Sequence, residues 1–506
     1  MHSKSKKIAK NTAMLYFRML FVLFASLYVS RVVLDTLGVQ DYGIYSAVGG
    51  VVALFNVICS SLTSATQRFI SFAIGQNSFA KIKSVFSSSI YVHTILCVLI
   101  LILAETAGLW FVENKMNIPG DRVTAAYWVY QFSVLSLLLM IASVPYNALI
   151  IAHERMEAFA YISVLDVLMR LAIAFAITKI RGDELVLYAL LLCCAQLIIR
   201  FCYTIYCWRH FEESHRPFRA EWKVVKEMAV FSGWSFWGNA AYVSYNQGLN
   251  VLLNVFFSPV VNAARSVTIQ VQSAGLQLLS GFQTAVSPQI TKSYAEGNLV
   301  YMHQLLFMSM RLSYYLMLIL AVPLVMETDV ILGFWLKEIP EHTHQFIRLV
   351  IITTLINSFA NPMIYAVKAA GRIKLYELVV GGLMLMILPI SYCFLKAGFP
   401  PDSVFVVHLL MEIIAQFARV FITKKLIGFA YKELVKYVIK SILLVSICTA
   451  VLSFFVYTLS ISISAVWNIV WCCLYVGCCL VSIYLVGLTA AEKNIIRSKI
   501  SQWASR

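Results

Sequence analysis

The sequence predicts an all-α, polytopic membrane protein with about fourteen transmembrane helices. Three observations predict it: an apolar composition, a series of long apolar runs, and basic residues that gather in alternate loops. Of the 506 residues, 60% are hydrophobic and 13% are charged, and the mean hydropathy is +0.80. Soluble domains carry about 25% charged residues, so this chain has too few to cover a water-facing surface. A soluble enzyme, a nucleic-acid-binding domain and a disordered protein are therefore excluded as descriptions of the whole chain.

A helix needs about 20 apolar residues to cross the hydrocarbon core of a bilayer. Runs of this kind lie at 12–33, 43–66, 84–104, 124–150, 159–178, 185–208, 229–257, 261–287, 300–325, 345–366, 375–396, 403–424, 437–459 and 464–488. The runs 43–66 and 261–287 are the most polar. The first run is long and lacks a small-residue cleavage site, so we expect it to remain as a helix rather than to act as a signal peptide.

The positions of the basic residues support this count. The net charge is +16, from 40 Lys and Arg against 24 Asp and Glu. Lys and Arg collect in the cytoplasmic loops of membrane proteins. With a cytoplasmic N-terminus, 26 of the 40 fall on the cytoplasmic side, 6 on the opposite side and 8 within spans. A wrong number of spans would scramble this alternation, so we expect both termini to be cytoplasmic.

A weak internal repeat relates two halves of the chain. Residues 31–77 match 253–299 at an offset of 222, and 145–159 match 362–376 at an offset of 217. The clearest pairs are Gln67 with Gln289, Ser71 with Ser293, Phe72 with Tyr294, Ala73 with Ala295, Gly75 with Gly297, Pro145 with Pro362 and Arg155 with Arg372. Six spans separate the copies, and an even number preserves orientation, so the repeat is parallel. Chance similarity between apolar helices is the alternative, but it explains matched prolines and loop residues poorly.

The repeat predicts two six-helix lobes followed by two extra helices. The expected segments are an N-terminal lobe at 1–208, a basic linker at 209–228, a C-terminal lobe at 229–426, two additional transmembrane helices at 437–488 and a cytoplasmic tail at 489–506. Aromatic and basic residues alternate in the linker at near-helical spacing, which favours an amphipathic helix on the inner membrane surface over a solvated linker. Pro145 and Pro362 should each kink or end a helix.

Three spans carry polar residues on one helical face. These are Gly49, Ala53, Asn56, Ser60, Thr63 and Gln67 in the second span, Asn239, Asn246, Asn250 and Asn254 in the seventh, and Ser266, Gln270, Ser273, Gln277, Ser280 and Thr284 in the eighth. Polar groups are costly in lipid, so such faces line a cavity or a helix contact. Helix packing through small residues explains Gly49 and Ala53, but it explains the Asn and Gln residues poorly. We therefore expect a hydrated central cleft between the lobes.

Charges within the spans are mostly cationic. They are Arg18, Arg31, Arg170, Arg200, Arg265, Arg311, Arg348 and Arg419, against Asp166 and Glu412. Asp166 and Arg170 are four residues apart and can pair along one helix. Several of the arginines lie near helix ends, where the side chain can simply extend to the membrane interface. Arg31, Arg265 and Arg348 lie at the outer ends. Arg18 and Arg311 lie deeper in the membrane. An excess of Arg in a cleft favours an anionic cargo, because the guanidinium group binds phosphate in a bidentate manner.

These arguments select the candidate site residues. The candidates for substrate binding are Arg18, Arg68, Arg311, Asn56, Ser60, Gln67, Asn239, Asn246, Asn250, Gln270 and Gln277. Asp166 and Glu412 are the candidates for coupling to an ion gradient. No Walker A loop, nucleophile elbow or His-Glu-x-x-His motif is present, so we expect neither an enzyme nor a metal or cofactor site. The 12 cysteines lie in or beside apolar runs and should be inert thiols.

Two short stretches resemble a known family. Ser30-Arg31-Val32-Val33-Leu34 and Leu37-Gly38-Val39-Gln40-Asp41-Tyr42-Gly43-Ile44-Tyr45 are similar to the first loop of polysaccharide transporters, the Wzx-type lipid-linked oligosaccharide flippases. These belong to the multidrug/oligosaccharidyl-lipid/polysaccharide (MOP) exporter superfamily. The resemblance implies a cleft lined by the first, second, seventh and eighth helices, in a protein of the bacterial cytoplasmic (inner) membrane. The implied cargo is an undecaprenyl-pyrophosphate oligosaccharide for surface polysaccharides such as the O-antigen of lipopolysaccharide.

The resemblance also implies a glycan polymerase or glycosyltransferases as protein partners, and no nucleic acid. Lipid II flippases and multidrug exporters are the nearest alternatives. Multidrug exporters have twelve helices and typically an acidic residue deep in the N-terminal lobe, whereas the first span here has no acid before Asp35. The leading prediction is therefore a flippase. The alternatives are an ion-coupled exporter of small amphipathic compounds and a non-transporting scaffold for glycan assembly.

Overall fold

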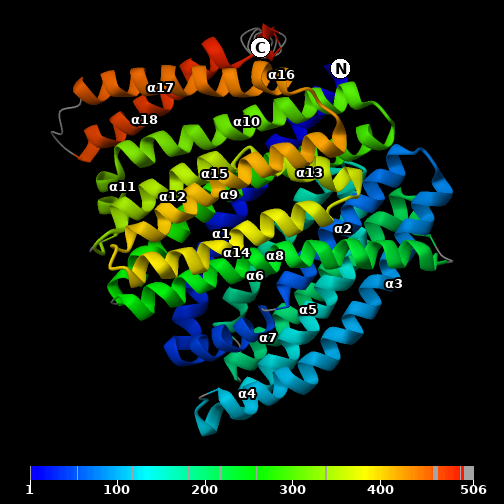
Figure 1. Cartoon of the computed structure of the whole chain (residues 1–506). Helices are drawn as coiled ribbons and strands as arrows, with labels where there is room; N and C mark the ends of the chain where they lie inside the picture. Colours follow the sequence, from blue (N-terminus) through cyan, green and yellow to red (C-terminus); the bar gives the residue numbers. More distant parts are fainter. Residues whose placement is uncertain are drawn as a thin grey trace, which may run out of the picture. The chain divides into compact units, whose positions relative to one another are not determined.

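The computed structural model describes residues 2–53, 55–116, 118–179, 183–215, 219–257, 259–336, 339–459, 465–490 and 492–494, and this part of the chain contains helices and no strand (Figure 1). The chain divides into two compact units. The first unit comprises Met1–Ala240 and Thr284–Gly297, and the second comprises Ala241–Gln283 and Asn298–Arg506. The prediction of an all-helical, multi-pass membrane protein is confirmed.

Among its described residues, the first unit contains seven long helices and several short ones. They are α1 (His2–Ala53), α2 (Asn56–Gly75), α3 (Phe79–Leu103), η1 (Ala104–Gly108), α4 (Leu109–Lys115), η2 (Gly120–Arg122), α5 (Val123–Ala152), α6 (Met156–Ile177), α7 (Glu184–His210), η3 (Glu212–Ser214) and the first part of α8 (Trp222–Phe256). Helix α5 packs on α2, α3 and α7, and α1 packs on α6. Their shared core includes Val48, Ile100, Val129, Tyr130 and Ile141.

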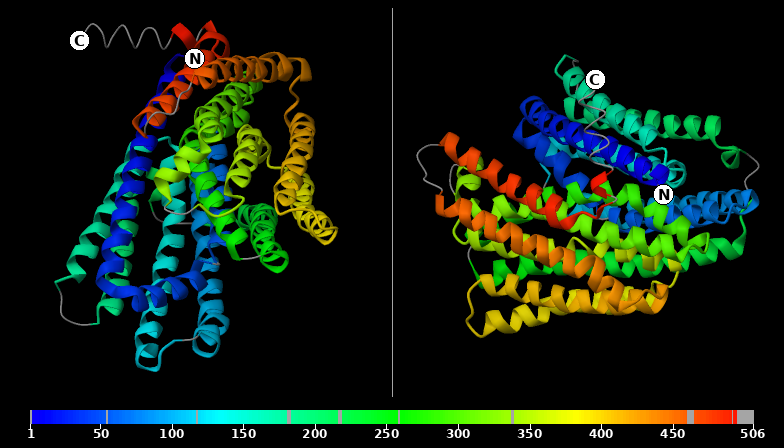
Figure 2. Two further views of the ribbon diagram at one scale, coloured as in Figure 1. Left: turned by 90° about the vertical axis from the view of Figure 1, so that its left-hand side faces the viewer. Right: turned by 90° about the horizontal axis from the view of Figure 1, so that it is seen from above.

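The second unit begins within α8 and extends to the end of the chain. Its elements are α9 (Pro259–Ala295), α10 (Leu299–Met326), α11 (Thr328–Trp335), α12 (Thr343–Asn357), α13 (Ala360–Ala370), α14 (Lys374–Lys396), α15 (Asp402–Ile427), α16 (Tyr431–Leu434), η4 (Val435–Ile439), α17 (Lys440–Leu459), α18 (Ala465–Ser482) and η5 (Ile483–Gly487). Helix α15 packs on α12, α13 and α14, while α17 and α18 form a hairpin against α10 (Figure 1). The further views show the same long helices joined by short connections (Figure 2).

Ten of the fourteen predicted spans lie in helical stretches of the described chain that are long and apolar enough to cross a membrane. Helices α1, α2, α8 and α9 are outside this set of ten, and they contain the first, second, seventh and eighth predicted spans. The chain therefore combines ten apolar helices with four longer or more polar ones.

The second predicted span differs from the structure. Helix α1 continues from the first span as far as Ala53 and bends at Gly38, which has φ 72° and ψ 172°. Glycine populates positive φ without a steric penalty, so it permits a sharp bend here. Helix α2 begins at Asn56 and runs to Gly75 rather than to residue 66. The predicted span 43–66 is therefore made of two helices.

The described residues of the linker at 209–228 do not form a separate helix, and residues 216–218 of the linker lie outside the described part of the chain. Helix α7 extends through His210, and α8 begins at Trp222. Between them, among the described residues, only the single turn Glu212–Ser214 is helical. The aromatic and basic spacing read from the sequence therefore belongs mostly to the first turns of α8.

The prolines have different effects in the structure. Helix α5 continues through Pro145 to Ala152, whereas the break between α12 and α13 immediately precedes Pro362. A third proline, Pro288, lies inside α9. Because proline has no N–H, the carbonyl of Thr284 lacks its usual intrahelical partner. Residue 284 is also where α9 passes from the second unit to the first.

Candidate functional site

The polar face predicted for the eighth span lies on α9 and is exposed. Five residues of the second unit form it, which we call the α9 polar row: Ser266, Gln270, Ser273, Gln277 and Ser280, every one of them exposed. The opposite face of α9 packs through Val271, Leu276 and Leu279 into an apolar cluster. A membrane helix with one apolar buried face and one polar exposed face requires water or a polar ligand beside it.

Two of the predicted asparagines hold a buried arginine. Arg265 of α9 is only 3% exposed. Its Nε donates to Oδ1 of Asn250 at 2.5 Å, and its Nη2 donates to the carbonyl oxygen of Asn246 at 2.8 Å. The sequence predicted Arg265 to extend to the outer interface, and this is wrong. Arg265 instead joins α9 to α8 inside the second unit.

The predicted polar faces of α2 and α8 meet inside the first unit. The Asn239 amide donates to the hydroxyl oxygens of Ser60 and Ser61, at 3.3 and 2.8 Å. Gln67 is half-buried further along α2. Asn56 is the first residue of α2, and its side chain lies outside the described part of the structure. Asn239 and Ser60 thus make a helix contact, which was the alternative to a cleft lining.

Two of the candidate arginines lie on aromatic rings in the first unit. The guanidinium carbon of Arg18 in α1 is 4.4 Å from the centroid of Phe159. Arg68 in α2 lies over Phe69, Phe72 and Phe231, at 4.6, 4.7 and 5.7 Å.

The first of these arginines has unused hydrogen-bonding capacity. The Nε of Arg18 is buried and has no hydrogen-bond partner among the described residues. Aromatic rings stabilise a guanidinium group without neutralising it. Arg18 therefore keeps a positive charge and a free N–H for an anion.

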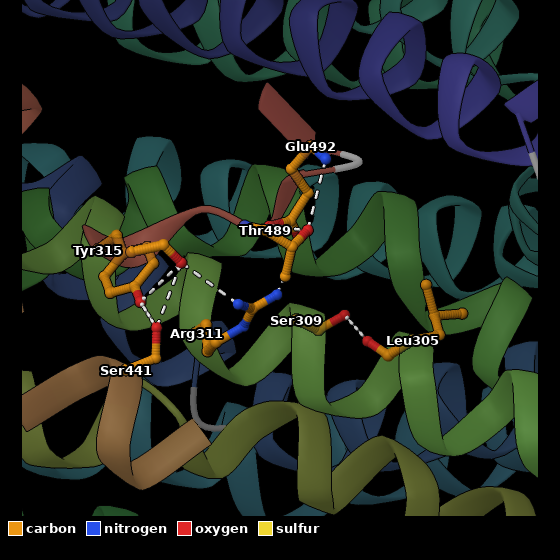
Figure 3. Close-up of polar contacts among 8 residues, drawn as sticks. Leu305, Ser309, Arg311, Tyr315, Ser441, Thr489 and Glu492 are labelled. Atoms are coloured by element: carbon orange, nitrogen blue, oxygen red, sulfur yellow. Dashed lines mark hydrogen bonds and ion pairs between the residues drawn. The ribbon is translucent and has the colours of Figure 1, made fainter. Parts of the chain in front are cut away.

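Arg311 is placed differently from Arg18. Its Nη2 pairs with Oε1 of Glu492 at 2.8 Å, and its Nη1 donates to the carbonyl oxygen of Gly487 at 3.3 Å (Figure 3). The Tyr315 hydroxyl donates to the same carbonyl oxygen, also at 3.3 Å. Thr489 and Glu492 form a reciprocal cap, since the Thr489 N–H donates to Glu492 Oε2 at 2.7 Å. The structure therefore holds Arg311 against the C-terminal segment of the second unit.

Both candidate coupling carboxylates are paired with arginines. Arg170 Nε donates to Asp166 Oδ2 at 3.2 Å along α6, as the spacing predicted. Glu412 of α15 is fully buried and pairs with Arg419. The Gln416 amide also donates to Glu412, at 3.3 Å. In this arrangement each carboxylate has a resident cation beside it.

The sequence interpretation missed a buried cluster at the turn between α5 and α6. Glu154 is 4% exposed and accepts from Lys292 Nζ and Gln289 Nε2, each at 2.6 Å. The sequence shows His153-Glu154-Arg155 as a charged loop with no partner group for catalysis, and the structure gives structural partners to both His153 and Glu154. The partners of Glu154 come from the end of α9, more than 130 residues away. The only available signal was the repeat, which matches Gln289 with Gln67.

His153 also has a partner, outside the membrane-spanning helices. Its Nε2 is 2.5 Å from Oε1 of Glu213, and its ring stacks on Phe211 at 4.3 Å between centroids. Burial alone would raise the pKa of the Glu213 carboxyl group. The hydrogen bond from His153 and the nearby charges outweigh burial, so the pKa of Glu213 lies below its ordinary value.

The motif at 37–45 also has a structural role. Arg122 of η2 pairs with Asp41 in α1, and its Nη1 pairs with Asp183 at 2.9 Å. Asp183 in turn caps α7 by accepting from the N–H groups of Leu185 and Val186, at 3.1 and 3.2 Å. One arginine therefore ties α1, α5 and α7 together just beyond the bend at Gly38.

Comparisons with known proteins identify the fold. No protein-family model matches the chain. A crystal structure of MATE in the bent conformation matches with a TM-score of 0.73 and 13% identity, over 84% of this chain and 96% of that one. The outward-facing conformation of a multidrug resistance MATE family transporter of the MOP superfamily matches with a TM-score of 0.72 and 12% identity, over 83% and 96%. The chain has the MATE-like fold.

Two further similarities accompany this MATE-like fold. A MOP superfamily transporter from Pyrococcus furiosus, described as having a binding pocket of reversed polarity that suggests a different function, matches with a TM-score of 0.69 and 13% identity over 84% and 96%. The uncharacterized membrane protein EpsK of Bacillus subtilis is 23% identical over 287 residues. That alignment covers 55% of each chain, so this chain spans about half the length of the curated relative it matches. These similarities show that the chain shares its fold with MATE transporters.

Proposed function

We propose that the chain flips an undecaprenyl-pyrophosphate oligosaccharide from the inner to the outer leaflet of the bacterial cytoplasmic membrane. The polar oligosaccharide and the pyrophosphate would cross through a hydrated, cationic cleft that opens alternately to each side, while the polyprenyl tail stays in lipid. Both termini would be cytoplasmic, as the distribution of Lys and Arg predicts.

The α9 polar row is the observation that carries this proposal. It presents three hydroxyl and two amide groups along about four helical turns, from Ser266 to Ser280, on an exposed face. Such a row offers a succession of donors and acceptors to sugar hydroxyl groups. A small apolar drug could not use so long a polar surface, because it would leave most of these groups without partners.

The anionic part of the cargo is assigned to the first unit. Arg18 and Arg68 both lie on aromatic rings, and Arg18 also has a buried Nε without a hydrogen-bond partner among the described residues, so we assign the pyrophosphate group to these two arginines. Arg311 is already paired with Glu492, and we therefore give it a structural rather than a cargo-binding role. The candidate arginines for binding the pyrophosphate are therefore Arg18 and Arg68.

An ion-coupled exporter of small amphipathic compounds is the second candidate. The similarity to a multidrug resistance MATE transporter favours it. Its coupling groups would be Asp166 and Glu412, and the resident arginines beside both make them poor sites for a further cation. We therefore place it second.

The test uses a strain whose surface polysaccharide depends on this chain. Arg18→Gln and Arg68→Gln should each lower export about tenfold or more, since a charge-assisted hydrogen bond contributes about 1.5–3 kcal/mol. Arg209→Gln, at the exposed end of α7, is the matched control and should export normally. Export is measured as surface polysaccharide per cell at equal amounts of membrane protein. Unchanged export in both variants, or drug resistance lost on Asp166→Asn, would contradict the proposal.

A further inference from the structure

The end of α9 is held on the first unit by a buried carboxylate. Glu154 accepts hydrogen bonds from Lys292 and Gln289, each at 2.6 Å, and its backbone carbonyl accepts from the Asn11 amide at 3.5 Å. The side chains of Glu154 and Lys292 are 3% and 14% exposed. One residue between α5 and α6 therefore bonds both α1 and the last turns of α9.

The backbone at Glu154 is unusual for a residue with a side chain. Its φ is 60°, in the left-handed region. The repeat places Gly371 at the equivalent position, and Gly371 has a φ of 74°. Glycine adopts this conformation freely, whereas glutamate does so at a steric cost. The second repeat thus satisfies the turn with glycine, and the first repeat keeps a carboxylate there.

The partners of Glu154 show the same asymmetry. Gln289 corresponds to Gln67 in the other copy, but Lys292 corresponds to Ile70, which is fully buried in an apolar cluster. The positions equivalent to Glu154 and Lys292 are Gly371 and Ile70, so they carry neither the acid nor the base of this ion pair. The charges are a property of one of two related surfaces and are not required by the fold as such.

The surroundings of the ion pair are closely packed. A Cβ atom on Gly75 would lie 2.7 Å from both the Ala295 Cβ and the Lys292 carbonyl oxygen, so only glycine fits against α9 here. Next to the turn, Leu15, Ile151, Met156 and Ala285 form a separate buried cluster. The last turns of α9 are therefore packed closely against α1, α2 and the turn at Glu154.

We propose that Glu154 is a latch that holds residues 284–297 of α9 on the first unit, and that transport requires its release. The requirement for release rests on the proposed alternating-access function. A buried ion pair suits a reversible contact, because its attraction is largely offset by the cost of removing the charges from water. When the contact opens, the hydration of both charges compensates for the lost pair.

The closed state is tested by cross-linking in a cysteine-free background. Gln76→Cys and Glu296→Cys place exposed thiols beside Gly75 and Ala295, and a short bismaleimide joins them when α2 and α9 are in contact. Glu154→Gln and Lys292→Gln should each lower the cross-linking rate about fivefold or more. Glu212→Gln, an exposed glutamate outside the latch, is the control and should leave the rate unchanged. Equal cross-linking rates in the double-cysteine protein and in its three variants would overturn the latch.

A second experiment tests release. Export is measured in cells carrying the two cysteines before and after joining them with a cleavable bismaleimide, and again after cleavage. We expect export to stop on joining and to return on cleavage. Continued export by the joined protein would overturn the need for release. Cross-linking rates can be measured without any cargo. If the cells show no export even before the cysteines are joined, the proposed function fails. The cross-linking rates of the variants would still show whether Glu154 and Lys292 hold α9 in place.

Discussion

Glu154 and Gly371 occupy equivalent positions in the two repeats, and both have a left-handed backbone, with φ of 60° and 74°. A residue with a Cβ pays about 1–2 kcal/mol for this conformation. At Glu154 the cost is offset by bonds to Lys292 and Gln289. At Gly371, which ends α13, no such compensation is needed.

The first prediction concerns Gly371. Gly371→Ala should lower the free energy of unfolding by about 1 kcal/mol, because alanine is strained in the left-handed region. Gly382→Ala is the matched control, since Gly382 lies within α14 with open space around its Cβ position. Alanine should stabilise that helix by about 0.5–1 kcal/mol. Thermal unfolding of the detergent-solubilised protein measures both, and shifts of the same sign would contradict the prediction.

The second prediction concerns water beside the α9 polar row. In a cysteine-free background, Gln270→Cys and Gln277→Cys should react with a membrane-impermeant thiol reagent from at least one side of the membrane. Phe417→Cys is the control, because Phe417 is 75% exposed on the apolar surface of α15 and should face lipid. Unreactive thiols at both α9 positions, or equal labelling of the Phe417→Cys variant, would contradict a hydrated passage beside α9.

The third prediction concerns the Arg311–Glu492 pair. Their side chains are 9% and 19% exposed. Glu492→Gln should destabilise the protein by about 2–3 kcal/mol, because it leaves a largely buried arginine without a counter-charge. Glu433→Gln, at an exposed glutamate of α16, should change stability by less than about 0.5 kcal/mol. The same unfolding measurement, extended to a double-mutant cycle with Arg311→Gln, checks the coupling, and additive effects would contradict it.

The fourth prediction concerns acid. The pKa of Glu213 is lowered in the folded protein, chiefly by the hydrogen bond from His153, with His215 also contributing. Its ionised form therefore stabilises the fold above its unfolded pKa of about 4.3. This contribution disappears as the pH falls through the lowered folded value. Glu213→Gln should abolish this part of the acid sensitivity, whereas Glu212→Gln should preserve it. Identical stability profiles from pH 7 to pH 3 would contradict the assignment.

The sequence predicted the fold class and most helix bounds, because apolar length and charge alternation depend on composition along the chain. The prediction is wrong where tertiary contacts determine where a helix bends or begins. A bend at Gly38 needs one residue with positive φ rather than a polar loop, so the hydropathy pattern could not locate it. In the linker 209–228, the part of the amphipathic spacing from Trp222 onward belongs to the start of α8 rather than to a separate helix.

The candidate site was predicted in part, for a related reason. The α9 polar row follows from helical periodicity, and the structure exposes all five of its residues. The partners of arginines do not follow from periodicity, since they come from distant segments. Arg311 meets Glu492 and Arg265 meets Asn250, and neither pairing is visible in the spacing of either helix. The Glu154 cluster was missed because its base lies on a helix from the other half of the sequence.

Pro288 weakens the hydrogen bonding of α9 between the polar row and the segment that bonds to Glu154. The polar row ends at Ser280, and Gln289 is the first residue of α9 that bonds to Glu154; the missing hydrogen bond of the Thr284 carbonyl lies between them. The last turns can therefore move without turning the polar row, so the proposed cargo contact and the proposed closure need not move as one rigid rod. Stiffening this part of α9 with Pro288→Ala would link the two motions mechanically, and a transporter built that way would have to loosen its hold on cargo each time it opened.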